Sequence, residues 1–175
     1  MRVLWAPWRL AYVEKPDATA GCIFCDKPRA ASADGRRDEL VLRVTDHASV
    51  IMNLFPYANG HIMVAPRRHT ADFAELDAGT SAHLQAELQR VVRVLTRAFG
   101  PAGFNVGMNL GRAAGAGIAD HLHWHVVPRW VGDTNFMPLL ADTHVMPEHL
   151  LATYERLLPI FEEDARERPL SAEEA

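Results

Sequence analysis

The chain has 175 residues, of which 49% are hydrophobic and 23% charged, and its formal net charge is −4 at pH 7. This balance is typical of one soluble globular domain, and it excludes wholesale disorder, a collagen-like repeat and a disulfide-dense miniature scaffold. The acidic excess and the lack of a long apolar run or signal peptide predict no nucleic-acid partner, no membrane partner and a cytoplasmic location.

The first quarter of the chain is irregular in composition. Residues 1–13 are rich in aromatic side chains and include Pro7, which predicts an arm packed on the body or on a partner subunit. Residues 14–38 are rich in glycine, proline and small or charged residues, which predicts a loop. The short apolar motif CIFC (22–25) interrupts this loop.

Three short apolar segments predict an antiparallel meander. A turn follows the first segment, and proline, asparagine and glycine break the chain between the second and the third. Residues 70–75 then predict about one helical turn. The three predicted strands cover residues 40–44, 49–54 and 61–65.

A long helix is predicted from Asp77 or Thr80, either of which is a suitable N-cap, to the Gly100-Pro101 pair that terminates it. Its apolar residues recur at helical spacing and form one face: Leu84, Leu88, Val91, Val92, Leu95 and Phe99. Several polar residues are expected on the solvent side: His83, Arg90, Arg93 and Arg97.

Two further strands are predicted at 104–109 and 121–128, with a glycine-rich loop at 111–117 between them. A C-terminal helix is predicted over 150–161, followed by a charged tail after Glu162 that we expect to fray. The apolar stripe of this helix consists of Leu150, Leu151, Tyr154, Leu157 and Leu158. The fold class is therefore α+β, with helices packed on one face of a five-stranded antiparallel sheet.

Three of the nine histidines, His121, His123 and His125, alternate along the predicted fifth strand. Side chains of a strand alternate between its faces, so these imidazoles should share one face, about 7 Å apart. They can be incidental surface residues, a metal cage, or a site of nucleotidyl transfer with one histidine as nucleophile. The preceding glycine-rich loop favours nucleotidyl transfer, because its backbone N–H groups can approach phosphate oxygens.

The motif HLHWHVV (121–127) resembles the His-φ-His-φ-His-φ-φ signature of the histidine triad family of nucleotide hydrolases and transferases. The segment 53–69, NLFPYANGHIMVAPRRH, is similar to the strand–turn–strand of that family, and CIFC resembles the Cys-x-x-Cys of many bacterial members. More narrowly, three segments resemble the branch of bacterial diadenosine tetraphosphate (AP4A) phosphorylases, which use phosphate to release ATP and ADP: LWAPWR (4–9), NVGMNLGRAAGAG (105–117), and PRW (128–130) followed by GDTNFMP.

The resemblance implies a role for individual residues. His123 would attack the α-phosphorus and carry a covalent AMP, and His125, the second catalytic residue, would contact the phosphate or the leaving group. Further substrate contacts would come from the side chains of Asn53, His61, Asn109 and Trp130 and from the backbone N–H groups of Ala116 and Gly117.

Hydrolytic relatives often place Gln and then Ser or Thr where Ala116 and Gly117 align. The missing side-chain donors favour phosphate over water as the acceptor. Two further functions stay open: a hydrolase of dinucleoside polyphosphates or of AMP conjugates such as adenosine phosphoramidate, and a nucleotide-binding protein of low turnover.

Cys22 and Cys25 form a lone Cys-x-x-Cys, which in a cytosolic protein is typically half of a metal site or a redox pair. A thioredoxin-like role would need a βαβ context that the predicted elements do not provide. The resemblance supplies His69 and His121 as two further ligands, which implies a structural zinc site. The alternative is that the two cysteines are buried thiols without a metal. No organic cofactor is expected.

The resemblance also implies a homodimer, and a tetramer is possible. We expect one domain over residues 1–175, with an N-terminal arm (1–21), a core (22–130) and a C-terminal extension that carries the last helix (131–175).

Overall fold

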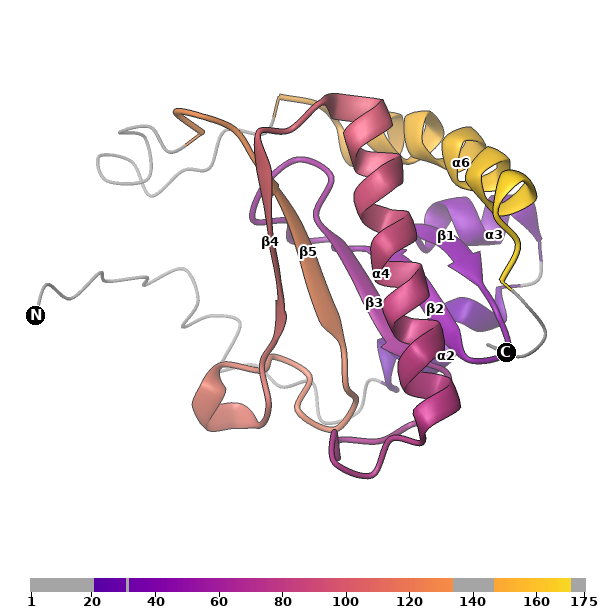
Figure 1. Ribbon diagram of the computed structural model, residues 1–175, viewed down its shortest axis with the longest axis vertical. Coiled ribbons are helices and arrows are strands. Elements are labelled where there is room, and N and C mark those ends of the chain that lie inside the picture. The colour runs from indigo at the N-terminus through magenta and orange to yellow at the C-terminus, as the bar shows by residue number, and fades with distance from the viewer. Residues whose placement is uncertain (1–20, 31, 134–146, 171–175) are drawn as a thin grey trace, which may run out of the picture.

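The structure is a computed structural model that describes residues 21–30, 32–133 and 147–170 (Figure 1). Predictions for the N-terminal arm and for residues 134–146 lie outside the described residues. The elements in chain order are α2 (Ile23–Asp26), the 3₁₀-helix η1 (Lys27–Arg29), α3 (Ala33–Asp38), β1 (Val41–Val44), β2 (Ala48–Met52), β3 (Ile62–Pro66), α4 (Ala78–Phe99), β4 (Gly103–Met108), the 3₁₀-helix η2 (Arg112–Ala114), β5 (Trp124–Arg129) and α6 (Leu150–Glu167).

The strands form one antiparallel sheet in the order β1-β2-β3-β5-β4, which confirms the predicted α+β fold. Strand β5 lies between β3 and β4, and His125 is paired with Met63 on one side and Gly107 on the other. The third histidine of the triad therefore sits on an inner strand, where pairing on both sides fixes its backbone. Among the described residues, no helix combines the length and the apolar character needed to cross a bilayer.

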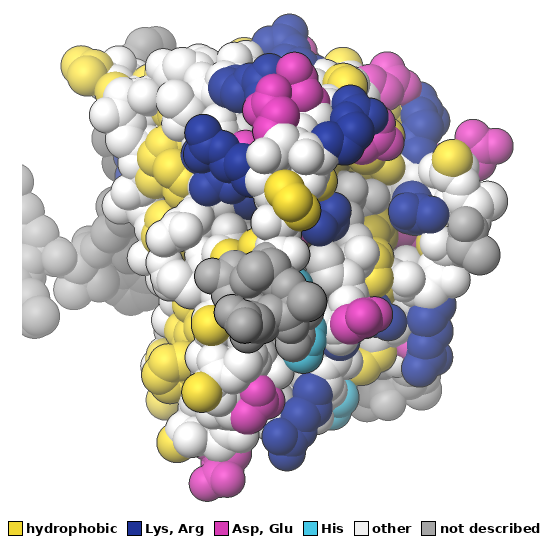
Figure 2. Space-filling model, turned by 45° about the vertical axis from the view of Figure 1, so that its right-hand side comes forward, with side chains coloured by type: hydrophobic (Ala, Val, Ile, Leu, Met, Phe, Trp, Pro, Cys, Tyr) yellow, Lys and Arg dark blue, Asp and Glu magenta, His cyan; other side chains and the backbone are white. Residues whose placement is uncertain are grey.

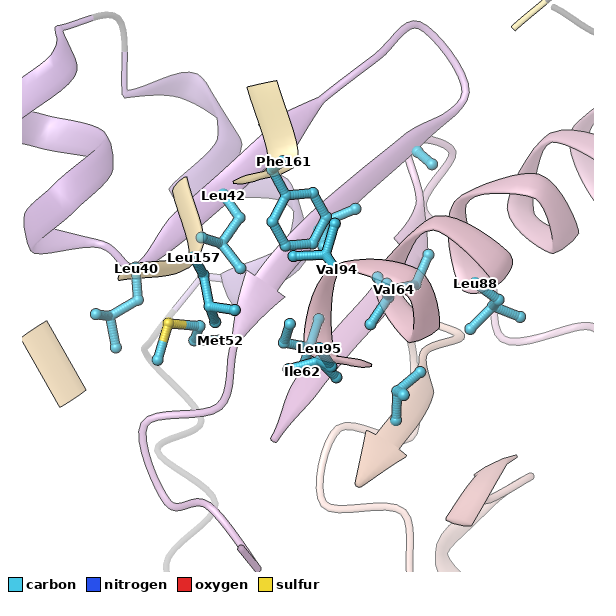
Figure 3. Close-up of a cluster of buried hydrophobic side chains, with 14 of the residues drawn as sticks. Leu40, Leu42, Met52, Ile62, Val64, Leu88, Val94, Leu95, Leu157 and Phe161 are labelled. Carbon is cyan, nitrogen blue, oxygen red and sulfur yellow. The ribbon is translucent and has the colours of Figure 1, made fainter. Parts of the chain in front are cut away.

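One face of the sheet is covered by α4, and α6 packs against α4 and β1 (Figure 1). The main core fills this layer with side chains from both helices and from the sheet (Figure 3). Helix α4 begins after Asp77, whose carboxylate accepts a hydrogen bond from the Thr80 N–H, and it ends at Gly100 in the left-handed conformation. Its buried apolar residues are Leu84, Leu88, Val91, Val94 and Leu95.

A second, smaller cluster lies apart from the main core and is built around Phe24 of α2. Alternation along β3 separates the two clusters: Ile62 and Val64 belong to the main core, whereas Met63 and Ala65 belong to the second. Since His125 is paired with Met63, the register places the triad on the face of the sheet opposite α4. The helices therefore stabilise one face and leave the other available for chemistry.

Several predicted local structures were wrong. The described part of the segment 14–38 contains the short helices α2, η1 and α3, and Ser32 caps α3 by accepting a hydrogen bond from Gly35 N–H. Residues 70–75 form side-chain-stabilised turns, in which Thr70 and Asp72 accept backbone N–H groups. Strand β5 begins only at Trp124, because the preceding segment donates from Leu122 N to Thr70 O (2.7 Å).

The solvent side predicted for the long helix was also wrong in part. His83 is buried, and its Nε2 lies 2.8 Å from Thr45 Oγ1. Arg90 is buried as well, and Val94 belongs to the core although the predicted apolar face omits it. The reason is that α4 packs against the sheet on one side and α6 on another, which buries a wider face than one apolar stripe indicates.

Charged residues at the α4–α6 contact form a buried ion network. Asp164 accepts hydrogen bonds from Arg90 Nη1 (2.8 Å) and from Arg93 Nε (2.9 Å). The charged tail predicted to fray after Glu162 therefore continues as helix, with one carboxylate enclosed. At the surface, acidic and basic side chains are intermingled (Figure 2), and Arg97 pairs with Glu163 across the two helices (2.7 Å).

We expect Asp164→Ala to lower the free energy of unfolding by about 3–5 kcal/mol, because it removes the buried carboxylate that pairs with both Arg90 and Arg93 and leaves Glu87 (3.4 Å) as the other carboxylate beside Arg90. The matched control is Glu163→Ala in the exposed pair, with an expected loss of about 1 kcal/mol or less. Urea denaturation measures both. Equal losses would contradict the importance of the buried network.

The same network predicts how the free energy of unfolding changes with pH. The hydrogen bonds and charge of Arg93 lower the pKa of Asp164 below its ordinary value of 3.8. The contribution of Asp164 is therefore fully present above that value and is lost as the pH falls below it, since the unfolded chain then binds the proton first.

Candidate active site and metal centre

The structure brings together the four residues predicted as metal ligands. Cys22 and Cys25 lie on one turn, closed by a hydrogen bond from Cys25 N to Cys22 O (2.9 Å). His69 comes from the loop after β3, and His121 directly precedes Leu122 at the approach to β5. One donor atom from each of the four lies within 4.8 Å of the others.

The spacing of these donors suits one tetrahedral ion. The Nδ1 of His121 lies 3.2 Å from Cys22 Sγ and 3.6 Å from Cys25 Sγ, and the Nδ1 of His69 lies 3.3 Å from Cys25 Sγ. Ligands of a tetrahedral ion at ordinary Zn–S and Zn–N lengths are separated by about 3.5 Å. This group can therefore hold a metal, and two thiolates with two imidazoles is a donor set that structural zinc sites use.

His121 is oriented for this role. Its Nε2–H donates to the carbonyl oxygen of Pro66 (2.8 Å), which leaves the Nδ1 lone pair directed at the sulfur atoms. Burial and the adjacent Cys22 raise the pKa of the Cys25 thiol. Two neighbouring thiolates thus need a cation beside them, which a metal ion would supply.

His123, the predicted nucleophile, is 6% exposed. Its Nδ1 lies 2.9 Å from the carbonyl oxygen of His121. A carbonyl can only accept, so Nδ1 carries the proton and Nε2 keeps its lone pair. Burial lowers the pKa of His123, which favours the neutral imidazole that nucleophilic attack requires.

His125 is oriented by His61, which is 1% exposed. The backbone N–H of Tyr57 donates to His61 Nδ1 (3.1 Å), so the proton of His61 resides on Nε2. This Nε2–H donates to His125 Nδ1 (2.9 Å), and His125 therefore carries its own proton on Nε2. Burial, and then the charges of His125 and His123, lower the pKa of His61 to about 3, so His61 stays neutral at physiological pH.

Several of the other predicted substrate-binding residues make hydrogen bonds within the protein. Asn53 donates to His61 Nδ1 (3.3 Å), and Asn109 donates to Gly115 O (3.4 Å) in the glycine-rich loop. The Ala116 N–H donates to Gly111 O (3.3 Å), a bond that it would exchange for one to phosphate. The ligand contacts expected of Asn53, His61, Asn109, Ala116 and Gly117 stay predictions.

Trp130 is not brought to the histidines within this chain. It follows β5 five residues after His125, which corresponds to about 16 Å along an extended strand. Its backbone N–H donates to Asp133 (3.2 Å). Its contact with the second nucleotide stays a prediction.

Two residues of the site were missed in the sequence. The ring of Phe24 is stacked on the ring of His123 with centroids 4.7 Å apart, and Tyr57 lies against His61 with centroids 4.5 Å apart. The signal for Phe24 was its place between the two cysteines predicted as metal ligands. Tyr57 contributes its backbone N–H, which donates to His61 Nδ1. Nearly every residue has such a group, so the residue type at position 57 could not indicate this contact.

Comparison with known proteins adds to this geometry. The family model described as HIT domain matches residues 35–131. An AP-4-A phosphorylase from Mycobacterium tuberculosis is 38% identical over 163 residues, which cover 89% of this chain and 81% of that protein. An adenosine 5′-monophosphoramidase from Schizosaccharomyces pombe is 31% identical over 108 residues, which cover 62% of this chain and 74% of that protein.

Solved structures show the same fold. A Zn-bound histidine triad family protein from Mycobacterium smegmatis superimposes with a TM-score of 0.60 at 24% identity, covering 74% of this chain and 88% of that one. A histidine triad nucleotide-binding protein from Sulfolobus tokodaii gives 0.65 at 24% identity, with coverage of 83% and 95%.

We expect the purified chain to bind one metal ion at the four-residue group, and Cys25→Ser to lower the metal content by more than about tenfold after dialysis against a chelator, because one of the four ligands is weakened. Inductively coupled plasma mass spectrometry measures the content. The control is His47→Ser, which alters a histidine outside the group. Equal metal retention in both variants would refute the site.

Proposed function

The chain belongs to the histidine triad (HIT) domain family, and we propose that it cleaves diadenosine tetraphosphate with inorganic phosphate, releasing ATP and ADP. It is an enzyme of the HIT nucleotidyl transferase and hydrolase type. The observation that carries the proposal is the set of hydrogen bonds from which the tautomers of His123 and His125 follow. One ring presents an unprotonated Nε2 and its neighbour a protonated one, with ring centroids 5.0 Å apart.

In the first step, His123 Nε2 attacks the α-phosphorus of the dinucleotide. The bond between that phosphorus and the bridging oxygen breaks, so ATP leaves and AMP stays bound to His123. The His125 Nε2–H donates to the departing phosphate oxygen, where negative charge develops. This step needs a neutral nucleophile and a positioned donor, and burial and the His61 relay support both.

In the second step, an oxygen of inorganic phosphate attacks the same phosphorus. The N–P bond breaks, ADP forms, and His123 regains its lone pair. Two displacements at one phosphorus give net retention and ping-pong kinetics. The absence of side-chain donors at Ala116 and Gly117 supports phosphate as the acceptor, since those positions offer no hydroxyl or amide to orient water.

A second candidate is hydrolysis of an AMP conjugate such as adenosine phosphoramidate. The 31% identity to the Schizosaccharomyces pombe monophosphoramidase supports this candidate. The first step is the same in both proposals, and the acceptor in the second step differs.

We further propose that the Cys₂His₂ group holds a structural zinc ion and that no organic cofactor takes part. The donor set and the Zn-bound Mycobacterium smegmatis relative support zinc. A bound zinc ion would hold the turn that carries Cys22 and Cys25 against His121, which lies just before β5. Thiolate ligands of this kind persist in a reducing cytoplasm, the location that we propose and that cell fractionation would check.

We expect AP4A to yield ATP and ADP only when phosphate is present, with products separated by ion-exchange chromatography. His123→Asn should lower kcat by at least about a thousandfold, since it removes the nucleophile, and His47→Ala serves as the control. An AMP adduct on wild-type His123 in mass spectra would support the covalent step.

Equal rates with water alone, giving AMP and ATP, would overturn the phosphorylase proposal and favour the hydrolase. Nucleotide binding without turnover in the wild type would reduce the protein to a binding protein.

We also propose a homodimer formed through the outer edge of β4, with a tetramer as a further possibility. Strand β4 ends the sheet, and Val106 on it is 50% exposed. An uncovered edge strand offers its backbone groups to a second chain. We expect analytical ultracentrifugation to show a dimer. Val106→Lys should raise its dissociation constant by about tenfold or more, whereas the control Val131→Lys should leave the dissociation constant unchanged. A monomeric wild type would contradict the proposal.

A further inference from the structure

Phe24 connects the metal centre to the nucleophile. It lies on the turn between Cys22 and Cys25, and its side chain is completely buried. Its ring is stacked on His123, with 4.7 Å between centroids and 28° between planes. The same ring contacts that of His121 at 5.3 Å and 54°.

The stacking limits how the His123 imidazole can rotate. The hydrogen bond from His123 Nδ1–H to His121 O (2.9 Å) fixes the position of Nδ1. This bond does not by itself fix the orientation of the ring plane, which depends on the side chains packed against the ring. A flat side chain at van der Waals distance fixes the plane, because tilting the imidazole would drive it into the phenyl ring. Together the two contacts determine where Nε2 points.

The position of Phe24 depends in turn on the turn that carries it. Helix α2 has four residues, too few to be stable from its own hydrogen bonds. The cysteines on either side of Phe24 are tied through the metal group to His121, and Phe24 packs on Met63 and Ala65 in the second apolar cluster. A bound ion would thus hold the short segment that carries the phenyl ring at both of its ends, at Cys22 and at Cys25.

We propose that Phe24 is a positioning residue through which metal binding orients the nucleophile. With the ion bound, the Cys22–Cys25 turn presses the phenyl ring on His123 and keeps its Nε2 directed at the substrate. Without the ion the turn loosens, and the imidazole samples other orientations. The effect on turnover rests on the proposed function, whereas the effect on the His123 ring does not.

The experiment compares Phe24→Leu with Phe161→Leu in the full chain loaded with metal. Phe161 is an equally buried phenylalanine of α6 in the main core, so its variant loses a ring without approaching the site. Long-range ¹H–¹⁵N NMR reports the tautomer of His123, and kcat and KM report turnover of AP4A.

We expect the wild type and Phe161→Leu to show His123 as a single Nδ1–H tautomer. Phe24→Leu should keep its metal but show averaged His123 signals, with kcat lowered by about tenfold to a hundredfold and KM little changed. Removing the metal from the wild type should average the His123 signals in the same way, while the signals of the main core persist. Removing it from Phe24→Leu should then add little, because both changes act through one contact.

An unaltered His123 tautomer in Phe24→Leu would overturn the proposal, and so would an equal change in Phe161→Leu. If Phe24→Leu does not fold, metal removal from the wild type decides: unaltered His123 signals in the metal-free protein refute the coupling. If the wild type cleaves no nucleotide, the proposed function fails, and the NMR comparison still judges the role of Phe24.

Discussion

His121 holds three parts of the molecule in register. Its Nε2–H donates to the carbonyl of Pro66 at the end of β3, and its Nδ1 faces the sulfur atoms of Cys22 and Cys25. Its own carbonyl accepts the Nδ1–H of His123, the predicted nucleophile. One residue thus joins a strand end, the turn of the candidate metal group and the ring of the predicted nucleophile. Because each bond uses a different atom, all three can be made at once.

Backbone groups decide which nitrogen of His123 and of His61 carries the proton. A carbonyl oxygen at His121 and an amide N–H at Tyr57 have opposite hydrogen-bonding character, so they place protons on different nitrogens of His123 and His61. The proton on His61 Nε2 is donated to His125 Nδ1, so the proton of His125 lies on its Nε2. His125 Nε2 is therefore a donor, whereas His123 Nε2 is an acceptor. Two chemically identical side chains thereby acquire complementary hydrogen-bonding character, one as acceptor and one as donor at Nε2. Burial strengthens the arrangement, since it lowers the pKa of His61 and of His123 and keeps both neutral.

The sequence predicted the sheet and the Cys22–Cys25 pair from short patterns, and the resemblance supplied His69 and His121, which the structure brings together with the two cysteines. Strand ends were predicted to within a residue or two, except that β5 begins at Trp124, where a tertiary hydrogen bond from Leu122 to Thr70 replaces strand pairing. Burial on α4 was less predictable. His83 and Arg90 are polar, and their burial depends on α6 and on the β1–β2 turn, which lie far away in sequence. The resemblance supplied the triad roles, but no pattern indicated that Phe24 would stack on His123.

The division of the sheet into two faces explains how such a site can be maintained. On the α4 side, α6 extends the core beyond the region matched by the HIT model, with Tyr154, Leu157 and Phe161 buried against it. The ion network around Asp164 lies in the same layer, so the stability of this layer does not rely on the metal group. On the other face, the small cluster around Phe24 contains fewer apolar residues and borders the candidate active-site histidines. A metal ion there would supply the rigidity that a small core cannot, at the place where a nucleophile must be held still.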